Sequence, residues 1–256
     1  MNILPAQVID LNITDYIKSF ELQKKIVFDM LNGYIKHDVI LILEHPKVFT
    51  LGKRGGRENL VVSEEYLQTQ NIEIIETERG GNITYHGPGQ LVLYPIINIE
   101  KRKIGVSDFV YALEELMIKS AKDFGVRAIR DSKNHGVWVK DGRGAIKSKL
   151  GSIGLSIKHG ISFHGLALNV NLDLTPFSWI NPCGMAGVSM TSLENEIKKS
   201  GEKEVVIYMK DVKEIILYHL KKIIGIELWR EPYKQENKNQ HGLKENFLKQ
   251  ALDMKR

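Results

Sequence analysis

Hydrophobic and polar residues recur along this chain with periods that predict a series of helices and strands. Helical spacing predicts helices over residues 15–32, 64–69, 106–124 and 209–223. Short apolar runs bounded by turn residues predict strands over 38–43, 48–51, 72–75, 91–99, 126–129, 136–139, 145–157, 161–170 and 226–229. Because the strands come in runs rather than in strict strand–helix alternation, we expect an α+β sheet with helices on one side.

Three of these strands carry further signals. Pro95 interrupts the run 91–99 and supplies no backbone N–H, so we expect this strand at a sheet edge or at a bulge. The pairs Asp141-Gly142 and His159-Gly160 predict hairpin turns on either side of the strand over 145–157.

The chain reads as one domain with a tail. No repeat and no low-complexity linker divides it, and we expect a catalytic domain over residues 1–229. Residues 230–256 form a polar, lysine-rich tail that predicts a loosely attached helix near 244–254. The tail holds 3 of the 5 net positive charges, because it contains seven Lys/Arg and four Asp/Glu. The remaining net charge of +2 does not indicate a surface that binds nucleic acid, so we expect no nucleic acid as a partner.

Composition excludes several classes of protein. No apolar run reaches the roughly 18 residues of a membrane span, and no basic leader begins the chain. The single cysteine excludes an internal disulfide and a thiol metal site. We therefore expect a cytoplasmic monomer without membrane association. No metal or nucleotide motif is present, so we expect no cofactor.

The segment from Arg79 to Gln90, with the sequence Arg-Gly-Gly-Asn-Ile-Thr-Tyr-His-Gly-Pro-Gly-Gln, concentrates glycine and polar side chains just before an apolar run. Glycine lets the backbone approach a ligand where a Cβ would clash. This combination is typical of a site that holds a long substrate.

Cys183 is the candidate nucleophile. It lies in a Pro-Cys-Gly turn, which exposes the sulfur and frees amides to bind an oxyanion; a lone cysteine is also often a small buried hydrophobe. Its thiolate needs a neighbouring cation or base. Period-two geometry places Lys147, Lys149 and Gly151 on one face, so pattern alone does not choose between the lysines, and we expect Gly151 to leave room beside the ammonium. Four histidines are the rival bases: His86, His135, His159 and His164.

Four motifs in order carry a resemblance to a known family. They are Arg79-Gly-Gly-Asn-Ile-Thr-Tyr-His-Gly-Pro-Gly-Gln90, Lys149-Leu-Gly-Ser-Ile-Gly154, His164-Gly-Leu-Ala167 and Pro182-Cys-Gly184. Together they resemble the lipoyl(octanoyl) transferases over about residues 39–193. Asn82 and Asn98 stand where that family often has Asp, and neither departure touches the proposed chemistry.

The resemblance implies the fold, the chemistry and the site. The fold is the mixed β-sheet with flanking helices of biotin and lipoate protein ligases. The activity is octanoyl transfer through an acyl-thioester on Cys183, with Lys149 as acid/base partner, which settles the choice between the lysines. The substrate-binding residues carried over are Arg79, Gly80, Gly81, Asn82, Ile83, Thr84, Tyr85, His86, Ser152, Ile153, Gly154, Gly165, Leu166 and Ala167.

The implied donor is octanoyl-acyl carrier protein. The implied acceptors are lipoyl domains of 2-oxoacid dehydrogenase E2 subunits and the H protein of glycine cleavage. We expect the acidic carriers to meet a mildly basic rim that includes Lys53, Arg54 and Arg57. Three alternatives remain: an ATP-dependent lipoate or biotin ligase, a Cys-dependent thioesterase or amidase, and a non-catalytic module that binds carrier proteins.

Overall fold

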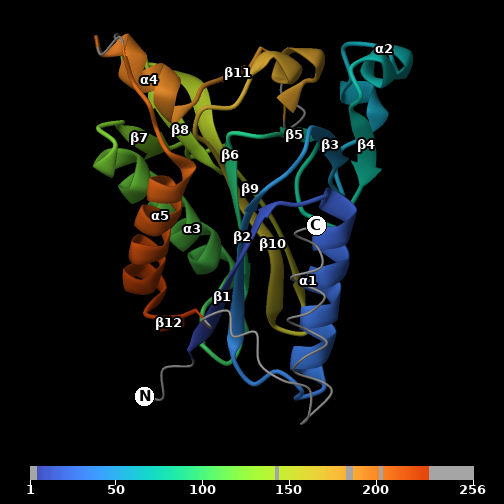
Figure 1. Ribbon diagram of the computed structural model, residues 1–256, viewed down its shortest axis with the longest axis vertical. Helices are drawn as coiled ribbons and strands as arrows, with labels where there is room; N and C mark the ends of the chain where they lie inside the picture. The colour runs from blue at the N-terminus through green and yellow to red at the C-terminus, as the bar shows by residue number, and fades with distance from the viewer. Residues whose placement is uncertain (1–4, 142–143, 183–186, 202–203, 231–256) are drawn as a thin grey trace, which may run out of the picture.

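The fold is built around a long mixed sheet (Figure 1). The computed structural model describes residues 5–141, 144–182, 187–201 and 204–230. In these residues the strand order of the sheet is β12-β1-β2-β6-β10-β9-β8-β7, and β11 pairs with β9. β1 runs parallel to both of its neighbours, β11 runs parallel to β9, and the other neighbours are antiparallel. A second sheet has the order β4-β3-β5.

The elements have the following bounds. The strands of the long sheet are β1 (Ala6–Ile13), β2 (Asp38–Glu44), β6 (Gln90–Ile96), β7 (Ala128–Arg130), β8 (Val137–Lys140), β9 (Ile146–Lys158), β10 (Ile161–Asn169), β11 (Ser189–Met190) and β12 (Leu228–Trp229). The small sheet contains β3 (Val48–Leu51), β4 (Glu73–Glu76) and β5 (Thr84–His86). The helices are α1 (Tyr16–Leu31), α2 (Glu64–Thr69), α3 (Val106–Asp123), α4 (Leu193–Lys199) and α5 (Met209–Ile224), with short 3-10 turns at Arg57–Asn59 and Thr175–Trp179.

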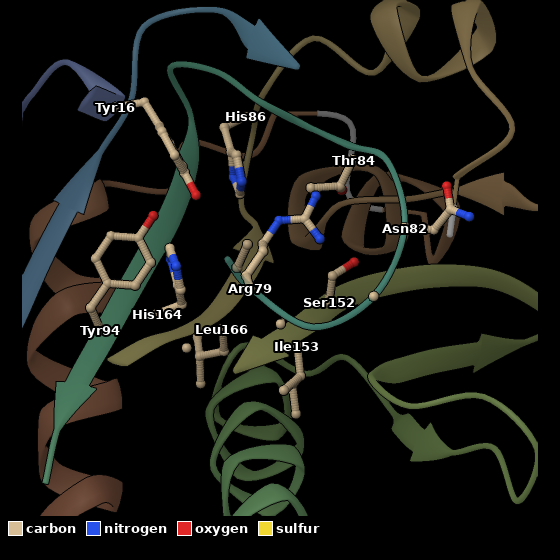
Figure 2. A pocket seen from close by; sticks show the side chains of 14 residues that line it. Tyr16, Arg79, Asn82, Thr84, His86, Tyr94, Ser152, Ile153, His164 and Leu166 are labelled. Carbon is tan, nitrogen blue, oxygen red and sulfur yellow. The ribbon is translucent and has the colours of Figure 1, made fainter. Parts of the chain in front are cut away.

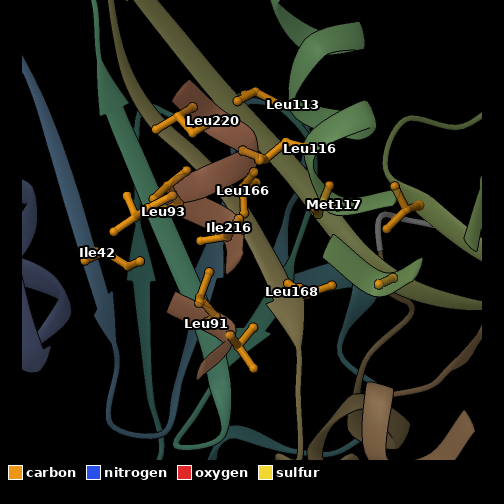
Figure 3. Packing of buried hydrophobic residues seen from close by; sticks show 14 of the residues in the cluster. Ile42, Leu91, Leu93, Leu113, Leu116, Met117, Leu166, Leu168, Ile216 and Leu220 are labelled. Carbon is orange, nitrogen blue, oxygen red and sulfur yellow. The ribbon is translucent and has the colours of Figure 1, made fainter. Parts of the chain in front are cut away.

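Helices cover both faces of the long sheet, so the expectation of helices on one side is wrong. α1 packs on one face, with Leu22 and Ile26 in the same apolar cluster as Leu41 of β2. α3 and α5 pack on the other face, where side chains such as Ile42 and Leu93 meet theirs (Figure 3). The cause is visible in the sequence: the continuous apolar run of β2 points hydrophobic side chains both ways, and both faces then need cover.

β6 lies inside the sheet, between β2 and β10, so the expectation of an edge strand is wrong. Its pairing with β10 runs from Gln90 to Leu93 and resumes only at a bridge between Asn98 and Ile161. Pro95 stands in the gap between them. Gly165 of β10 makes that gap possible, because a Cβ there would lie 2.7 Å from Pro95 Cδ and 2.1 Å from Leu93 O.

Most other predicted elements are confirmed to within two residues. α1 begins where Asp15 accepts a hydrogen bond from the backbone N–H of Lys18 at 3.0 Å, which is an ordinary N-cap. β1, β5, β11 and α4 had no counterpart among the predictions. Gly142 and the tail beyond Arg230, with its predicted helix at 244–254, lie outside the described residues.

Candidate active site

A pocket opens where β5, β6, β9 and β10 meet the loop before β5 (Figure 2). The space between its walls, open solvent at the mouth included, amounts to about 460 Å³. Its lining consists of Tyr16, Arg79, Gly81, Asn82, Thr84, His86, Tyr94, Ser152, Ile153, Gly154, His164, Gly165, Leu166 and Ala167.

The structure brings together eleven of the fourteen residues that the resemblance predicted for substrate binding. The other three are Gly80, Ile83 and Tyr85. Ile83 and Tyr85 are buried in a separate apolar cluster under the small sheet, and the Gly80 N–H donates to Leu155 O at 2.9 Å. Tyr16 and Tyr94 line the pocket without any motif that would have identified them. His164 appeared among the predictions only as a rival base.

Arg79 is a buried cation held in one orientation by the small sheet. Its Nε donates to Thr50 Oγ1 at 3.1 Å, one terminal nitrogen donates to Thr50 O at 2.6 Å, and the other donates to Gly80 O at 3.1 Å. These bonds fix the guanidinium against β3. Its positive charge therefore has a fixed place beside the pocket.

His45 and Tyr94 form a hydrogen-bonded pair beside the pocket, in which the position of each proton follows from the neighbouring groups. His45 Nδ1 lies 2.7 Å from Thr14 O, and because a carbonyl only accepts, Nδ1 carries the proton. His45 Nε2 is then an acceptor, and Tyr94 Oη donates to it at 2.8 Å. Burial lowers the pKa of His45 to about 4, so the ring is neutral at pH 7.

His86 is also neutral, and its proton is placed by its neighbours. Gln90 Nε2 donates to Asn169 Oδ1 at 2.9 Å, which leaves Gln90 Oε1 to accept from His86 Nδ1 at 2.7 Å. Burial, and after it the charges of His45 and Arg79, hold the pKa of His86 well below 6.5. His86 therefore presents a lone pair on Nε2.

Lys149, predicted as the acid/base partner, lies near the start of β9 and is 2% exposed. Its Nζ lies 5.0 Å from the centroid of the Trp138 ring. The register between β8 and β9 shifts on both sides of this pair, between Val137 and Trp138 and again between Val139 and Lys140. Such bulges re-aim side chains and break the strict alternation of sides that a regular strand would have.

The glycine that makes room for Lys149 is Gly136, not Gly151 as predicted. A Cβ on Gly136 would lie 2.8 Å from Lys149 Cε and 3.4 Å from its Nζ. A Cβ on Gly151 would instead collide with the apolar core, 2.6 Å from Met117 Sδ. The bulge between β8 and β9 explains the error.

Cys183 lies outside the described residues, so the structure does not place the predicted nucleophile. The chain on both of its sides is described. Before it, the Asn181 N–H donates to Asn59 O at 2.8 Å. After it, β11 pairs Met190 with Lys149, and the Thr191 N–H donates to Lys149 O at 2.9 Å.

The rival histidines differ in position. His86 and His164 line the pocket. His135 is exposed, 3.5 Å from Glu114, and His159 lies in the turn between β9 and β10. In the described part of the chain, no group of three or more His, Cys, Asp or Glu is arranged to hold a metal ion. Nor does any described helix have the length and hydropathy to cross a membrane.

Comparison with known proteins identifies the family. The model of the lipoyl protein ligase A/B catalytic domain matches residues 15–221. The chain belongs to this family. An octanoyltransferase from Desulfotalea psychrophila is 53% identical over 189 residues, which cover 74% of this chain and 83% of that protein. An octanoyltransferase from Syntrophobacter fumaroxidans is 36% identical over 226 residues, 88% and 93% of the two chains.

Solved structures show the same fold at much lower identity. A crystal structure of lipoate-protein ligase A bound with ATP superposes with a TM-score of 0.66 at 14% identity, covering 98% of this chain and 94% of that chain. A bipartite lipoate protein ligase from Thermoplasma acidophilum gives 0.65 at 15% identity, covering 99% and 92%. The predicted mixed sheet with flanking helices, in the fold of lipoate protein ligases, is thus confirmed.

Proposed function

We propose that this protein is an octanoyltransferase that moves an octanoyl group from acyl carrier protein to a lysine of a lipoyl domain, through a thioester on Cys183. The observation that carries the proposal is the place of Lys149. It lies on β9 three residues before Ser152 of the pocket, and β11, which follows the Cys183 segment, pairs with it.

The first half-reaction transfers the acyl group to the protein. The Cys183 thiolate attacks the thioester carbonyl of the octanoyl carrier, and the bond between that carbonyl and the pantetheine sulfur breaks. The departing sulfur takes a proton from the Lys149 ammonium and leaves as a thiol. One thioester replaces another, so the step is nearly isoenergetic and needs no ATP.

The second half-reaction delivers the acyl group to the acceptor. The neutral amine of the lipoyl-domain lysine attacks the Cys183 thioester and gives a proton to neutral Lys149. The carbon–sulfur bond breaks and restores the Cys183 thiolate and the Lys149 ammonium. Because an amide is more stable than a thioester, this step runs one way. Donor and acceptor visit the same site in turn, which gives ping-pong kinetics.

The pocket suits the acyl chain and its rim suits acidic carriers. Ile153, Leu166 and Ala167 supply apolar lining, and Gly154 leaves room for Arg79, whose Cδ would lie 3.1 Å from a Cβ there. Lys53 and Arg54 are exposed, and their backbone N–H groups donate to the carbonyls of Arg79 and Gly81 beside the pocket, whereas Arg57 is engaged by Glu64. The acceptors we propose are lipoyl domains of 2-oxoacid dehydrogenase E2 subunits and the glycine cleavage H protein. The Thermoplasma acidophilum relative was solved as part of a system with its E2 lipoyl domain.

The remaining parts of the proposal concern the whole chain. We place the catalytic domain at residues 1–229 and treat 230–256 as an appended tail. We expect the protein to act as a monomer in the cytoplasm, together with the acyl carrier protein and the lipoyl domains.

Intact-protein mass spectrometry tests the proposal. After incubation with octanoyl-acyl carrier protein, the wild type should gain one octanoyl group that hydroxylamine or a lipoyl domain removes. Cys183→Ser should gain none that hydroxylamine removes rapidly, and should not turn over. If acylation of the lipoyl domain instead requires ATP and free octanoate and survives Cys183→Ser, the protein is a ligase. Release of free octanoate without an acceptor would make it a thioesterase.

A further inference from the structure

One end of the pocket is lined by polar atoms that no described residue satisfies. The Tyr16 hydroxyl and both ring nitrogens of His164 are buried without a hydrogen-bond partner in the described part of the chain, as is Gln23 Nε2 nearby. Thr77 and Arg79 approach the Tyr16 hydroxyl closely enough to oppose the rise in its pKa from burial, but neither completes a hydrogen bond of good geometry. Figure 2 shows Tyr16, Tyr94 and His164 converging on one place.

The backbone conformation and two neighbouring side chains fix the position of His164. Its φ is +56°, a left-handed conformation that few side chains adopt but His tolerates better than most. Its N–H donates to Gln23 Oε1 at 2.7 Å, and its ring stacks on Phe20 with centroids 4.9 Å apart. The ring is therefore fixed, while its two nitrogens have no hydrogen-bond partner among the described residues. Burial, aided by the charge of Arg79, lowers the pKa of His164 to about 3, so the ring is neutral.

This polar end lies away from Lys149. His164 pairs with Leu155 in the ladder between β10 and β9, and Leu155 is six residues beyond Lys149 along β9. Six strand residues span roughly 20 Å between backbone positions, and the side chains at both ends take up part of that length. Ser152, Ile153 and Gly154 line the pocket between the two ends. An acyl chain attached beside Lys149 would therefore point its methyl end toward Tyr16 and His164.

We propose that Tyr16 and His164 form a hydrated polar floor that limits the acyl chain to octanoyl length, and this inference rests on the proposed function. Buried polar groups without partners are costly, and several of them around one space are the setting in which an ordered water is held. An octanoyl chain ends short of the floor. A longer chain must displace the water and leave the polar atoms facing a methyl group, so its transition state is reached at a higher cost.

The test uses Tyr16→Phe, which keeps the ring and removes only the hydroxyl, with Tyr34→Phe on the exposed surface as its control. Transfer rates to a lipoyl domain are measured with octanoyl, decanoyl and 8-hydroxyoctanoyl carriers. In Tyr16→Phe the ratio of kcat/KM for decanoyl to that for octanoyl should rise about fivefold, which corresponds to about 1 kcal/mol. The ratio for 8-hydroxyoctanoyl to octanoyl should fall, because an ω-hydroxyl loses its partner. Tyr34→Phe should change neither ratio.

A binding measurement separates this inference from the proposed function. Calorimetry with acyl-pantetheines on Cys183→Ala, with and without Tyr16→Phe, should show the same two shifts in affinity. If the wild type transfers no acyl group but the affinities shift as stated, the floor stands and the transferase assignment fails. If octanoyl transfer proceeds and neither ratio changes in Tyr16→Phe, the floor does not contact the end of the chain and the inference is overturned.

Discussion

Gly136 lies just before β8, where a Cβ would come within 2.8 Å of Lys149 Cε across the bulged pairing of β8 and β9. The same Cβ would also lie 2.4 Å from Gly151 O, and both distances are shorter than those at which Cβ atoms approach other atoms in folded proteins. Gly136 also has a φ of +107°, which L side chains rarely adopt. The place of the proposed acid/base group therefore depends on a residue with no side chain.

Gly136→Ala should displace the Lys149 ammonium and slow the formation of the octanoyl adduct by about 10²-fold, the effect of moving a catalytic group by about 1 Å. Rapid-quench mass spectrometry measures the rate of adduct formation. Gly125→Ala is the matched control, because Gly125 has a φ of +77° but nothing within 4 Å of its Cβ position. Equal losses in the two variants would attribute the effect to backbone strain rather than to Lys149.

Glu114 of α3 is proposed to position Gly136 and, through it, Lys149. Glu114 Oε1 accepts from the Gly136 N–H at 3.0 Å, and its Oε2 lies 3.2 Å from Arg130 Nε. Glu114→Ala should lower kcat for octanoyl transfer about tenfold with little change in KM, since the pocket itself is untouched. Glu114→Gln keeps an acceptor and should retain most of the activity. Glu115→Ala, which removes the neighbouring pairs with Arg130 and Lys119 but not the contact with Gly136, should leave kcat near the wild-type value.

The predicted elements of the fold came from patterns that local chemistry controls. The run of β2, the amphipathic α3 and the start of α1 next to Asp15 are each determined by a few neighbouring residues, and all three are where the sequence indicated. The errors concern tertiary context. Pro95 indicates an edge strand unless it is known that Gly165, on the adjacent strand, has no Cβ and leaves room for the proline ring. That helices cover both faces can be inferred only when the strand order is known.

The site divides in the same way. Residues in glycine-rich motifs, such as Arg79 and Gly154, were identified because their spacing matches a family. Tyr16 was not, since an aromatic residue at the start of an amphipathic helix reads as ordinary core. Gly136 was missed because its role depends on a register shift in β8 and β9, and register shifts leave no mark in a single sequence.

Loss of the hydroxyl group should lower the stability of the protein by different amounts at the two tyrosines beside the pocket. Tyr94→Phe leaves His45 Nε2 buried without a donor, and we expect it to lower the free energy of unfolding by about 1–3 kcal/mol. Tyr16→Phe removes a hydroxyl that has no partner in the described residues, so we expect a change within about 0.5 kcal/mol. Urea unfolding at pH 7.5 measures both. A loss for Tyr16→Phe as large as that for Tyr94→Phe would mean that a protein group, rather than the water of the proposed floor, binds its hydroxyl.

The buried histidines should make the protein sensitive to acid. The pKa is about 4 for His45 and about 3 for His164, and that of His86 is well below 6.5, whereas each histidine in the unfolded chain titrates near 6.5. Above pH 6.5 neither state binds these protons and stability is unaffected. As the pH falls below 6.5 the unfolded state takes up protons that the folded state refuses, so the free energy of unfolding decreases.

Each such histidine contributes a slope of about 1.4 kcal/mol per pH unit between about pH 6 and pH 4. Urea unfolding at pH 7.5, 6.0 and 5.0 measures the slope. His164→Asn should reduce it by about one proton, because Asn accepts the same left-handed backbone without titrating. His159→Asn is the matched control, since His159 has a φ of +47° but is exposed in the turn between β9 and β10, and it should leave the slope unchanged. An unaltered slope in His164→Asn would show that His164 is protonated, or open to solvent, in the folded protein. That result would contradict the neutral, buried ring on which the proposed floor depends.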